Sequence, residues 1–198
     1  MKANRLVLTV LLLVTAAVFQ LPAQQNEADR KVLAEIRAGA DKGDAKAQYE
    51  LGRAFFSGTL GVAKDEAEAV KWYRKAAEQN VADAQYNLGV CYANGQGVTE
   101  DDAESVKWFR KAAEQNFADA QYNLGVYYDS GEGVAKDEVE AYKWWLLAAG
   151  QGNDDAKYNM TIVENKMSRE QIAEGRRLAR DFKPRKVPSE GSDARLPP

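Results

Sequence analysis

Apolar side chains recur at every fourth position in three stretches of the chain, a spacing that places them on one face of a helix. The three sets are Ala47, Leu51 and Phe55; Ala84, Leu88 and Tyr92; and Ala120, Leu124 and Tyr128. A glycine follows the leucine in each set, at Gly52, Gly89 and Gly125. Glycine inside a helix costs about 0.5–1 kcal/mol relative to alanine. Three glycines in one register therefore predict positions where another helix packs closely.

A second helical pattern follows each of these stretches after a short loop. An aspartate opens it and a glutamate stands three residues later, as with Asp101 and Glu104. This pair predicts a capping box, in which the two side chains satisfy free amide donors at the start of a helix. Trp72, Trp108 and Trp144 share one register inside the pattern. We expect these tryptophans to be core residues that stack from unit to unit and meet the alanines of the next helix.

The two helical patterns repeat together along the chain. The sequence ADAQYNLGV occurs at residues 82–90 and 118–126, and similar sequences occur at 45–53 and 154–162. Residues 82–117 and 118–153 are identical at 20 of 36 positions, and the first unit holds one extra loop residue. A single helix pair cannot bury both of its faces, whereas stacked pairs can. We therefore predict an all-α fold, a right-handed α-solenoid (superhelix) of antiparallel helix pairs with about 36 residues per repeat.

The first residues have the layout of a secretory signal peptide. Lys2 and Arg5 precede an apolar run over 6–19, which is shorter than the roughly 20 residues that a membrane-spanning helix needs. We predict cleavage after Ala23, with cleavage after Ala17 and an uncleaved anchor as the alternatives. The protein is then expected to be exported, periplasmic or secreted.

The rest of the chain divides into repeats and caps. Ser168 and Gln171 predict a capping box that opens the last helix. Inward-facing positions are expected at Leu33, Ile36 and Ala40 in the first cap, and at Ile172, Gly175, Ala179 and Phe182 in the last. The predicted division is a signal peptide over 1–23, an N-terminal capping helix over 24–44, repeat one over 45–81, repeat two over 82–117, repeat three over 118–153, a degenerate repeat four with a C-terminal capping helix over 154–183, and a disordered tail over 184–198.

Composition narrows the chemistry that this fold can carry. The chain has 27 basic and 30 acidic residues, whereas a nucleic-acid binder needs a basic face to neutralise phosphates. It has no histidine and one cysteine, which removes the commonest general base, Cys/His zinc sites and any intrachain disulfide. That residue, Cys91, has no basic neighbour in the sequence to lower its pKa. We expect no metal, no cofactor and no nucleic acid.

Three motifs resemble catalytic or binding signatures but lack their defining features. The Gly-x-Gly-Val loops at 95–98 and 131–134 lack the third glycine and the preceding strand of a dinucleotide fingerprint. Asp101, Asp102 and Glu104 lack the spacing of a calcium loop. No serine is followed by lysine three residues later, as penicillin-recognising serine enzymes require. Turns and helix caps are the better interpretations of the first two.

Taken together, the repeated residues resemble a known family. Residues 45–160 are similar to the Sel1-like repeat (SLR), a relative of the tetratricopeptide repeat. The shared features, in chain order, are Ala-Gln-Tyr, Leu-Gly, an aromatic residue, Gly-x-Gly-Val, an acidic cap and Lys-Trp with Ala-Ala. The resemblance implies a superhelix with a concave groove and a scaffold that binds peptides or proteins. Exported bacterial members often serve in envelope assembly, signalling control or host contact. Some exported relatives have been linked to β-lactam hydrolysis, but those carry paired cysteines.

Positions that differ between units on the first helix of each pair are not needed for the fold and can determine which partner binds. Constant polar positions beside the apolar stripe are further candidates for contact with a partner. The glutamines and asparagines either bind the main chain of an extended peptide or bond to each other and to neighbouring units. The predicted partner-binding residues are Gln48, Arg53, Phe56, Gln85, Asn87, Gln121, Asn123, Tyr127 and Asp129. The predicted structural residues are Leu51, Gly52, Trp72, Leu88, Gly89, Trp108, Leu124, Gly125 and Trp144.

The sequence thus favours a non-catalytic scaffold or adaptor exported to the bacterial cell envelope, with a protein or peptide partner in the concave groove of the repeats. We expect no contact with the membrane after signal cleavage. The alternative is an exported hydrolase or a modulator of cell-wall or β-lactam chemistry.

Overall fold

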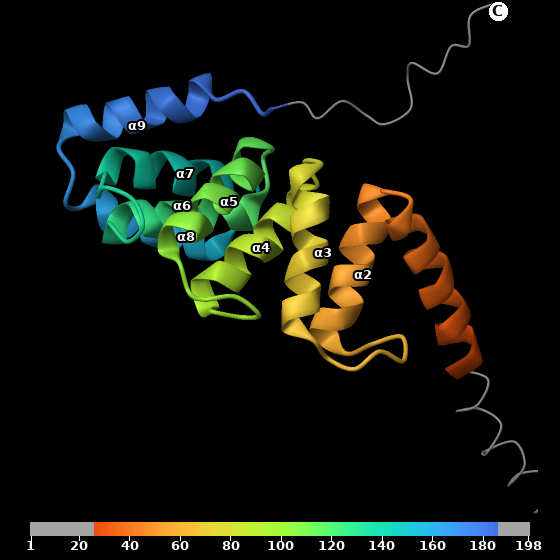
Figure 1. Ribbon diagram of the computed structural model, residues 1–198. Helices are drawn as coiled ribbons and strands as arrows, with labels where there is room; N and C mark the ends of the chain where they lie inside the picture. Colours follow the sequence, from red (N-terminus) through yellow and green to blue (C-terminus); the bar gives the residue numbers. More distant parts are fainter. Residues whose placement is uncertain (1–25, 186–198) are drawn as a thin grey trace, which may run out of the picture.

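The structure, a computed structural model, describes residues 26–185, and these contain helices and no strand (Figure 1). A first helix covers residues 26–41. It is followed by α2 (Ala45–Ser57), α3 (Glu66–Glu78), α4 (Ala82–Asn94), α5 (Asp102–Glu114), α6 (Ala118–Ser130), α7 (Glu138–Gly150), α8 (Asp154–Glu164) and α9 (Arg169–Asp181). The predicted signal peptide over 1–23 and residues 186–198 of the predicted tail lie outside the described residues.

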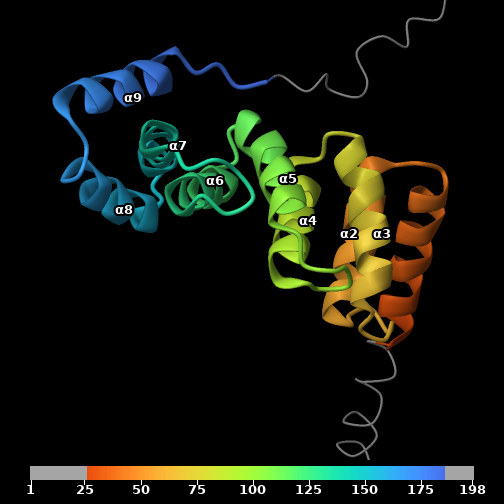
Figure 2. The ribbon, with the colours of Figure 1, turned by 60° about the vertical axis from the view of Figure 1, so that its left-hand side comes forward.

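The helices form a file of antiparallel hairpins, and the predicted all-α solenoid is confirmed (Figure 2). The pairs are α2 with α3, α4 with α5, and α6 with α7, and the second helix of each pair also packs on the first helix of the next. We call α2, α4, α6 and α8 the A helices, and α3, α5 and α7 the B helices. The core is correspondingly a row of clusters at the junctions between neighbouring hairpins.

Within each hairpin the A helix carries the glycine of the repeated Leu-Gly pair against an aromatic ring of its B helix. A Cβ atom on Gly52 would lie 2.7 Å from the ring of Tyr73, and one on Gly125 would lie 2.5 Å from the indole of Trp145. Gly89 stands in the same relation to Phe109. The cost of glycine in a helix is therefore offset here by a close approach between the two helices.

The aspartates at the starts of the B helices cap them, but the predicted capping box is half wrong there. Asp101 Oδ1 accepts a hydrogen bond from the Glu104 amide over 3.0 Å. The return bond is missing, because the Asp101 amide already donates to the Tyr92 carbonyl over 3.0 Å. The Glu104 carboxylate instead accepts from the indole of Trp108 over 3.1 Å and from Lys107 over 2.6 Å. The acidic residue thus supplies the acceptor that a buried indole N–H needs.

The tryptophans pack on alanines rather than on one another. Trp108 is buried in a cluster with Ala69, Ala76 and Ala77 of the preceding B helix. Trp144 has the equivalent place beside Ala112 and Ala113, whereas Trp72 is only partly buried beside the helix over 26–41. The expectation that tryptophans in one register meet alanines of a neighbouring helix is confirmed for Trp108 and Trp144, and the alanines belong to the preceding B helix. Each indole fills the space that small side chains leave at a junction.

The loops between A and B helices connect each repeat to the one before it. Gly97 has a φ of +70°, and a Cβ there would lie 2.2 Å from the carbonyl oxygen of Glu66, at the start of the preceding B helix. Gly133 has the same relation to Asp102. Gly61, the equivalent residue of the first repeat, has no neighbouring atom within 4 Å of its Cβ position. The first loop therefore has room for its extra residue because it rests on no preceding B helix.

The two ends of the array are covered in different ways. In the first cap, Leu33 and Ala40 are buried in one cluster with Leu51, and Ile36 packs against it. At the other end, α9 lies across α7 rather than pairing with α8 (Figure 1).

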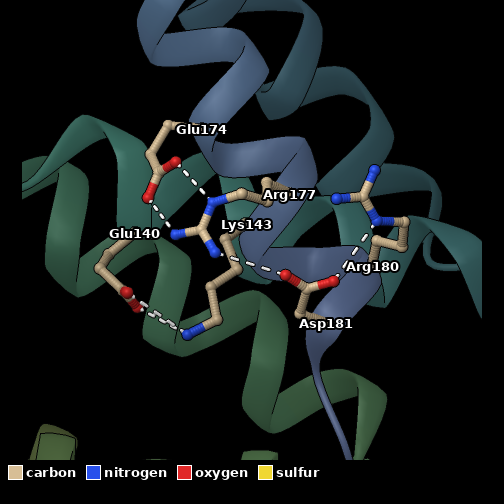
Figure 3. A network of polar contacts seen from close by, with 6 residues as sticks. All are labelled: Glu140, Lys143, Glu174, Arg177, Arg180 and Asp181. Atoms are coloured by element: carbon tan, nitrogen blue, oxygen red, sulfur yellow. Dashed lines mark hydrogen bonds and ion pairs between the residues drawn. The ribbon is translucent and has the colours of Figure 1, made fainter.

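Side chains of α9 hold it on α7. A Cβ on Gly175 would lie 2.6 Å from the ring of Tyr142, and the rings of Phe182 and Trp144 meet edge to face at 5.6 Å. The predicted capping box of Ser168 and Gln171 is present at the start of this helix. Its outer side carries exposed ion pairs, in which Arg177 lies between Glu174 and Asp181 (Figure 3).

Candidate partner-binding face

A row of buried glutamines joins the A helices to the ends of the B helices. Gln85 donates to the Ala77 carbonyl over 3.0 Å and accepts from the Gln115 amide over 2.7 Å. Equivalent bonds join Gln48 to Ala40 and Gln79, and Gln121 to Ala113 and Gln151. The exposed fractions of Gln48, Gln85 and Gln121 are 6%, 1% and 0%. Each of these bonds adds a second donor to a carbonyl near a helix C-terminus that already accepts from a turn amide, as the Asn80 amide donates to Ala77 over 3.0 Å.

The prediction that these three glutamines bind a partner is therefore wrong. Their amide groups are used inside the array, as in the second of the two alternatives that the sequence left open. The asparagines are less enclosed. Asn87 is partly buried near Tyr49 and Tyr73, and Asn123 is partly buried near Tyr86. Burial raises the pKa of these three tyrosines, so the asparagines face protonated hydroxyls.

Several of the predicted contact residues meet around one cavity between α2 and α4, which we call the α2–α4 cavity. It has a volume of about 250 Å³. Arg53 and Phe56 line it from α2, and Asn87 lines it from α4. The remaining lining residues are Ser57, Tyr73, Tyr86, Val90 and Cys91. The structure thus brings together three of the nine predicted partner-binding residues at the first junction between repeats.

A second cavity, the α6–α8 cavity, lies at the third junction and also has a volume of about 250 Å³. Its lining residues are Val126, Asp129, Ser130, Trp145, Asn159, Ile162, Val163 and Lys166. Seven of these eight are the repeat equivalents of residues that line the α2–α4 cavity. The pairs are Arg53 and Val126, Phe56 and Asp129, Ser57 and Ser130, Tyr73 and Trp145, Asn87 and Asn159, Val90 and Ile162, and Cys91 and Val163. The two cavities are therefore one feature of the repeat, formed twice with different side chains.

At the middle junction the equivalent position holds a larger side chain. Tyr127 stands where the other two junctions have Cys91 and Val163. Its ring lies 6.0 Å from that of Phe109, and its hydroxyl donates to Asp102 Oδ1 over 3.3 Å and lies 3.1 Å from Ser105 Oγ. Both the ring and the hydroxyl of Tyr127 thus make contacts between α5 and α6, and its role as a contact for a partner stays a prediction.

The electrostatic character of the two cavities differs. Arg53 is the only charged lining residue of the α2–α4 cavity, and it forms an exposed ion pair with Glu50 over 3.3 Å. Asp129 and Lys166 line the α6–α8 cavity. Burial raises the pKa of the Cys91 thiol to about 12, with a smaller contribution from the Glu66 charge, so this residue is a neutral wall of its cavity rather than a nucleophile.

Exposed apolar side chains occur on α6 and α8, and two of them, Val126 and Ile162, line the α6–α8 cavity. Four large hydrophobic residues are conspicuously exposed among those that the structure describes, and three of them belong to α6 and α8. They are Val126 at 37%, Tyr158 at 69% and Ile162 at 41%. Apolar side chains exposed together mark surfaces that meet a partner more often than surfaces that face only water.

Sequence reasoning missed the residues that α7 and α8 contribute to this cavity. Trp145, Asn159, Ile162 and Val163 all lie in helices whose register could be counted from the repeat. Counting forward from the α2–α4 set would have found them. Lys166 follows the end of α8, where the repeat pattern has decayed, and no sequence signal placed it there.

Comparison with known proteins agrees with the repeat geometry. A profile of the Sel1 repeat matches residues 45–81, 82–117 and 118–153. The chain belongs to the Sel1 repeat family. The resemblance noted from the sequence is thereby confirmed, and Sel1 repeat proteins are generally non-catalytic scaffolds for protein–protein interaction.

Solved Sel1 repeat structures have the same fold. A Sel1 repeat protein from Oxalobacter formigenes is 44% identical, with a TM-score of 0.62, over 66% of this chain and 98% of that one. The protein c5321 of uropathogenic Escherichia coli, described as a protective antigen with an SLR fold, is 30% identical with a TM-score of 0.58, over 77% of this chain and 40% of that one.

A curated relative is similar over a shorter stretch. The ERAD-associated E3 ubiquitin-protein ligase component HRD3A of Arabidopsis thaliana is 34% identical over 58 residues, which are 29% of this chain and 9% of that protein. This chain therefore corresponds to a small part of that relative.

Membrane-spanning helices and metal sites were both sought among the described residues. Over residues 26–185, no helix combines the length and the hydropathy needed to cross a membrane. In the same range, no three His, Cys, Asp or Glu side chains come together in a way that could hold a metal ion.

Proposed function

We propose that this protein is a non-catalytic adaptor that binds an extended segment of a partner protein along its A helices. The observation that carries the proposal is the pair of equivalent cavities between α2 and α4 and between α6 and α8. Both are lined largely by positions that vary from repeat to repeat, whereas the constant positions build the hairpins. Such a surface can be selected for one partner without a loss of stability.

The exposed apolar residues favour a protein partner. Val126 and Ile162 border the α6–α8 cavity and are open to solvent, so a partner that covers them removes apolar surface from water. The HRD3A relative is named as a component of a larger assembly, which supports an adaptor role.

We further propose that the protein is exported to the cell envelope. The support is the positive start at Lys2 and Arg5 and the apolar run over 6–19. Mass spectrometry of the protein recovered from an envelope fraction would show a new N-terminus after Ala23 or Ala17. An unprocessed chain that stays in the cytosolic fraction would contradict this part of the proposal.

Site-specific photo-crosslinking in the cell tests the binding face. A benzoylphenylalanine in place of Phe56 or Val126 is expected to form an adduct with a partner protein. The same group in place of Lys71 or Lys107, which are exposed on B helices, serves as the matched control and is expected to form none. Adducts that arise equally from the B helices would contradict the assignment of the face. Turnover of a cell-wall or β-lactam substrate by the purified protein would instead support the hydrolase alternative.

A further inference from the structure

Resting on the proposed function, we infer that the α6–α8 cavity binds an aromatic side chain, phenylalanine or tyrosine, of the partner segment. The first support comes from the other two junctions, where a ring from an A helix packs on the aromatic ring of a B helix. The ring centroids of Phe56 in α2 and Tyr73 in α3 are 6.2 Å apart, and those of Tyr127 in α6 and Phe109 in α5 are 6.0 Å apart. The two pairs also have similar tilts, 45° and 40°. A second ring on the B-helix aromatic residue is thus a recurring part of a junction.

The third junction lacks this second ring. Asp129 stands at the position of Phe56, and Val163 stands at the position of Tyr127. Trp145, the B-helix aromatic residue of this junction, takes part in no ring-to-ring contact among residues 26–185. Its indole is larger than the rings at the other junctions, yet a cavity of about 250 Å³ remains beside it. The α2–α4 cavity already has a ring of this kind in its wall, Phe56, so the aromatic side chain is assigned to the α6–α8 cavity alone.

The size and the walls of the cavity suit an aromatic ring. An apolar cavity of about 150 Å³ can hold a benzene ring, so the volume of about 250 Å³ is sufficient. Val126, Ile162 and Val163 are aliphatic, and Trp145 contributes its indole. Val126 and Ile162 are 37% and 41% exposed, so a ring that enters the cavity covers apolar surface that otherwise faces water.

The charges of the lining favour a neutral occupant. Asp129 and Lys166 are the two charged lining residues, and they have opposite signs. The lining as a whole therefore attracts neither a cation nor an anion, and a charged side chain would lose its hydration here without a net partner. Ser130 and Asn159 are neutral polar lining residues, which suit the hydroxyl group of tyrosine.

Nuclear magnetic resonance titration with three short peptides tests the assignment. The peptides are acetylated and amidated, alike except for a central phenylalanine, leucine or lysine. The chain has three isoleucines, Ile36, Ile162 and Ile172, so the methyl signal of Ile162 is identified by its loss in Ile162→Val. We expect the phenylalanine peptide to shift this signal and to bind about fivefold more tightly than the leucine peptide, as an added aromatic pair would give. No shift at millimolar concentration, or binding of the leucine or lysine peptide that is as tight, would overturn the inference.

Two substitutions place a ring of the chain itself in the cavity. Val163→Tyr introduces the side chain of the middle junction at this position, and Asp129→Phe introduces that of the first junction. Each is expected to weaken binding of the phenylalanine peptide at least about tenfold, because the space for its ring is then filled. Cys91→Tyr, the same change as Val163→Tyr but at the α2–α4 cavity, is the matched control and is expected to leave the affinity unchanged. Circular dichroism checks that each variant is folded. Undiminished binding to either folded variant would overturn the inference.

The outcomes distinguish this inference from the proposed function on which it rests. Crosslinks from Phe56 and Val126 without any preference for the phenylalanine peptide would refute only the assignment of an aromatic side chain. Equal crosslinks from the A and B helices would refute the proposed face itself.

Discussion

The side chain of Gln115, at the end of α5, donates a hydrogen bond to Gln85 of α4 over 2.7 Å. The amide of Gln85 in turn reaches the carbonyl of Ala77, at the end of the preceding B helix, so one buried glutamine connects three helices. The same arrangement recurs with Gln48 and Gln121. These glutamines form a buried polar row inside the solenoid, which we call the glutamine seam, and their side-chain amides find hydrogen-bond partners within the protein.

Replacement of the central glutamine is therefore expected to be destabilising. Gln85→Ala leaves the Gln115 amide without its acceptor and removes one of the two donors to the Ala77 carbonyl, which keeps its bond from the Asn80 amide over 3.0 Å. We expect a loss of about 1–3 kcal/mol in the free energy of unfolding. Urea denaturation followed by circular dichroism measures it. Lys46→Ala, at an exposed position of α2, serves as a control with an expected change near zero. A Gln85→Ala protein as stable as the parent would show that the seam does not stabilise the array.

Two loop glycines provide a matched test of contact between repeats. Gly97 and Gly61 both have a positive φ, +70° and +77°, but only Gly97 lies against a preceding B helix. Gly61→Ala is expected to cost only the left-handed strain, about 1–2 kcal/mol. Gly97→Ala should cost more, because its Cβ would overlap the backbone at Glu66. Thermal unfolding of the two variants compares them, and equal losses would contradict the contact.

The burial of Cys91 predicts a slow reaction with thiol reagents. The thiolate is the reactive form, and burial raises the pKa of this thiol from 9.0 to about 12. At pH 8 the native protein should react with a disulfide reagent at least about a hundredfold more slowly than the protein unfolded in urea. A rapid reaction in the native state would mean that the α2–α4 cavity opens readily at this wall.

The same pKa shift predicts a loss of stability in alkali. Since the folded protein holds the thiol proton more tightly than the unfolded chain does, the contribution of Cys91 is complete below pH 9 and is lost as the pH rises from 9 towards 12. Urea denaturation of the parent and of Cys91→Ser between pH 8 and 10.5 isolates this contribution from those of tyrosine and lysine. Parallel curves for the two proteins would contradict it.

Tyr127 should be a structural residue of the middle junction. Tyr127→Val, which introduces the side chain that α8 has at the equivalent position, removes a ring packed on Phe109 and is expected to cost about 2–4 kcal/mol. Tyr127→Phe keeps the ring and loses only the hydroxyl bonds near Asp102 and Ser105, so about 0.5–1.5 kcal/mol is expected. Urea denaturation ranks the two, and a costless Tyr127→Val would refute the role.

The repeat made the hairpins predictable, because its periodicity fixes which face of each helix is apolar. The glycines of the Leu-Gly pairs and the aspartate caps could be placed in the same way. The second half of the capping box could not, since the Asp101 amide is satisfied by Tyr92 and the Glu104 carboxylate by Trp108, and both bonds depend on tertiary packing.

The candidate site was only partly predictable for a related reason. Arg53, Phe56 and Asp129 were found because they vary between repeats, and they do line cavities. Gln85 and Asn87 both lie beside the apolar stripe, and only the contacts of Gln85 with Ala77 and Gln115 of the neighbouring B helices distinguish the two. The crossing of α9 over α7 also lies beyond the repeat pattern, which has ended by that point.

The contacts that the loop glycines make with the preceding hairpin all point the same way along the array. Gly97 lies against the start of α3 and Gly133 against the start of α5, so the loops of repeats two and three both rest on the B helix of the repeat before them. The loop contacts therefore all run from a repeat to the one before it, whereas the core clusters at the junctions bury side chains of both repeats. Loss of the last hairpin would leave the loop glycines of the earlier repeats on their neighbours, whereas loss of the first would remove the surface against which Gly97 lies.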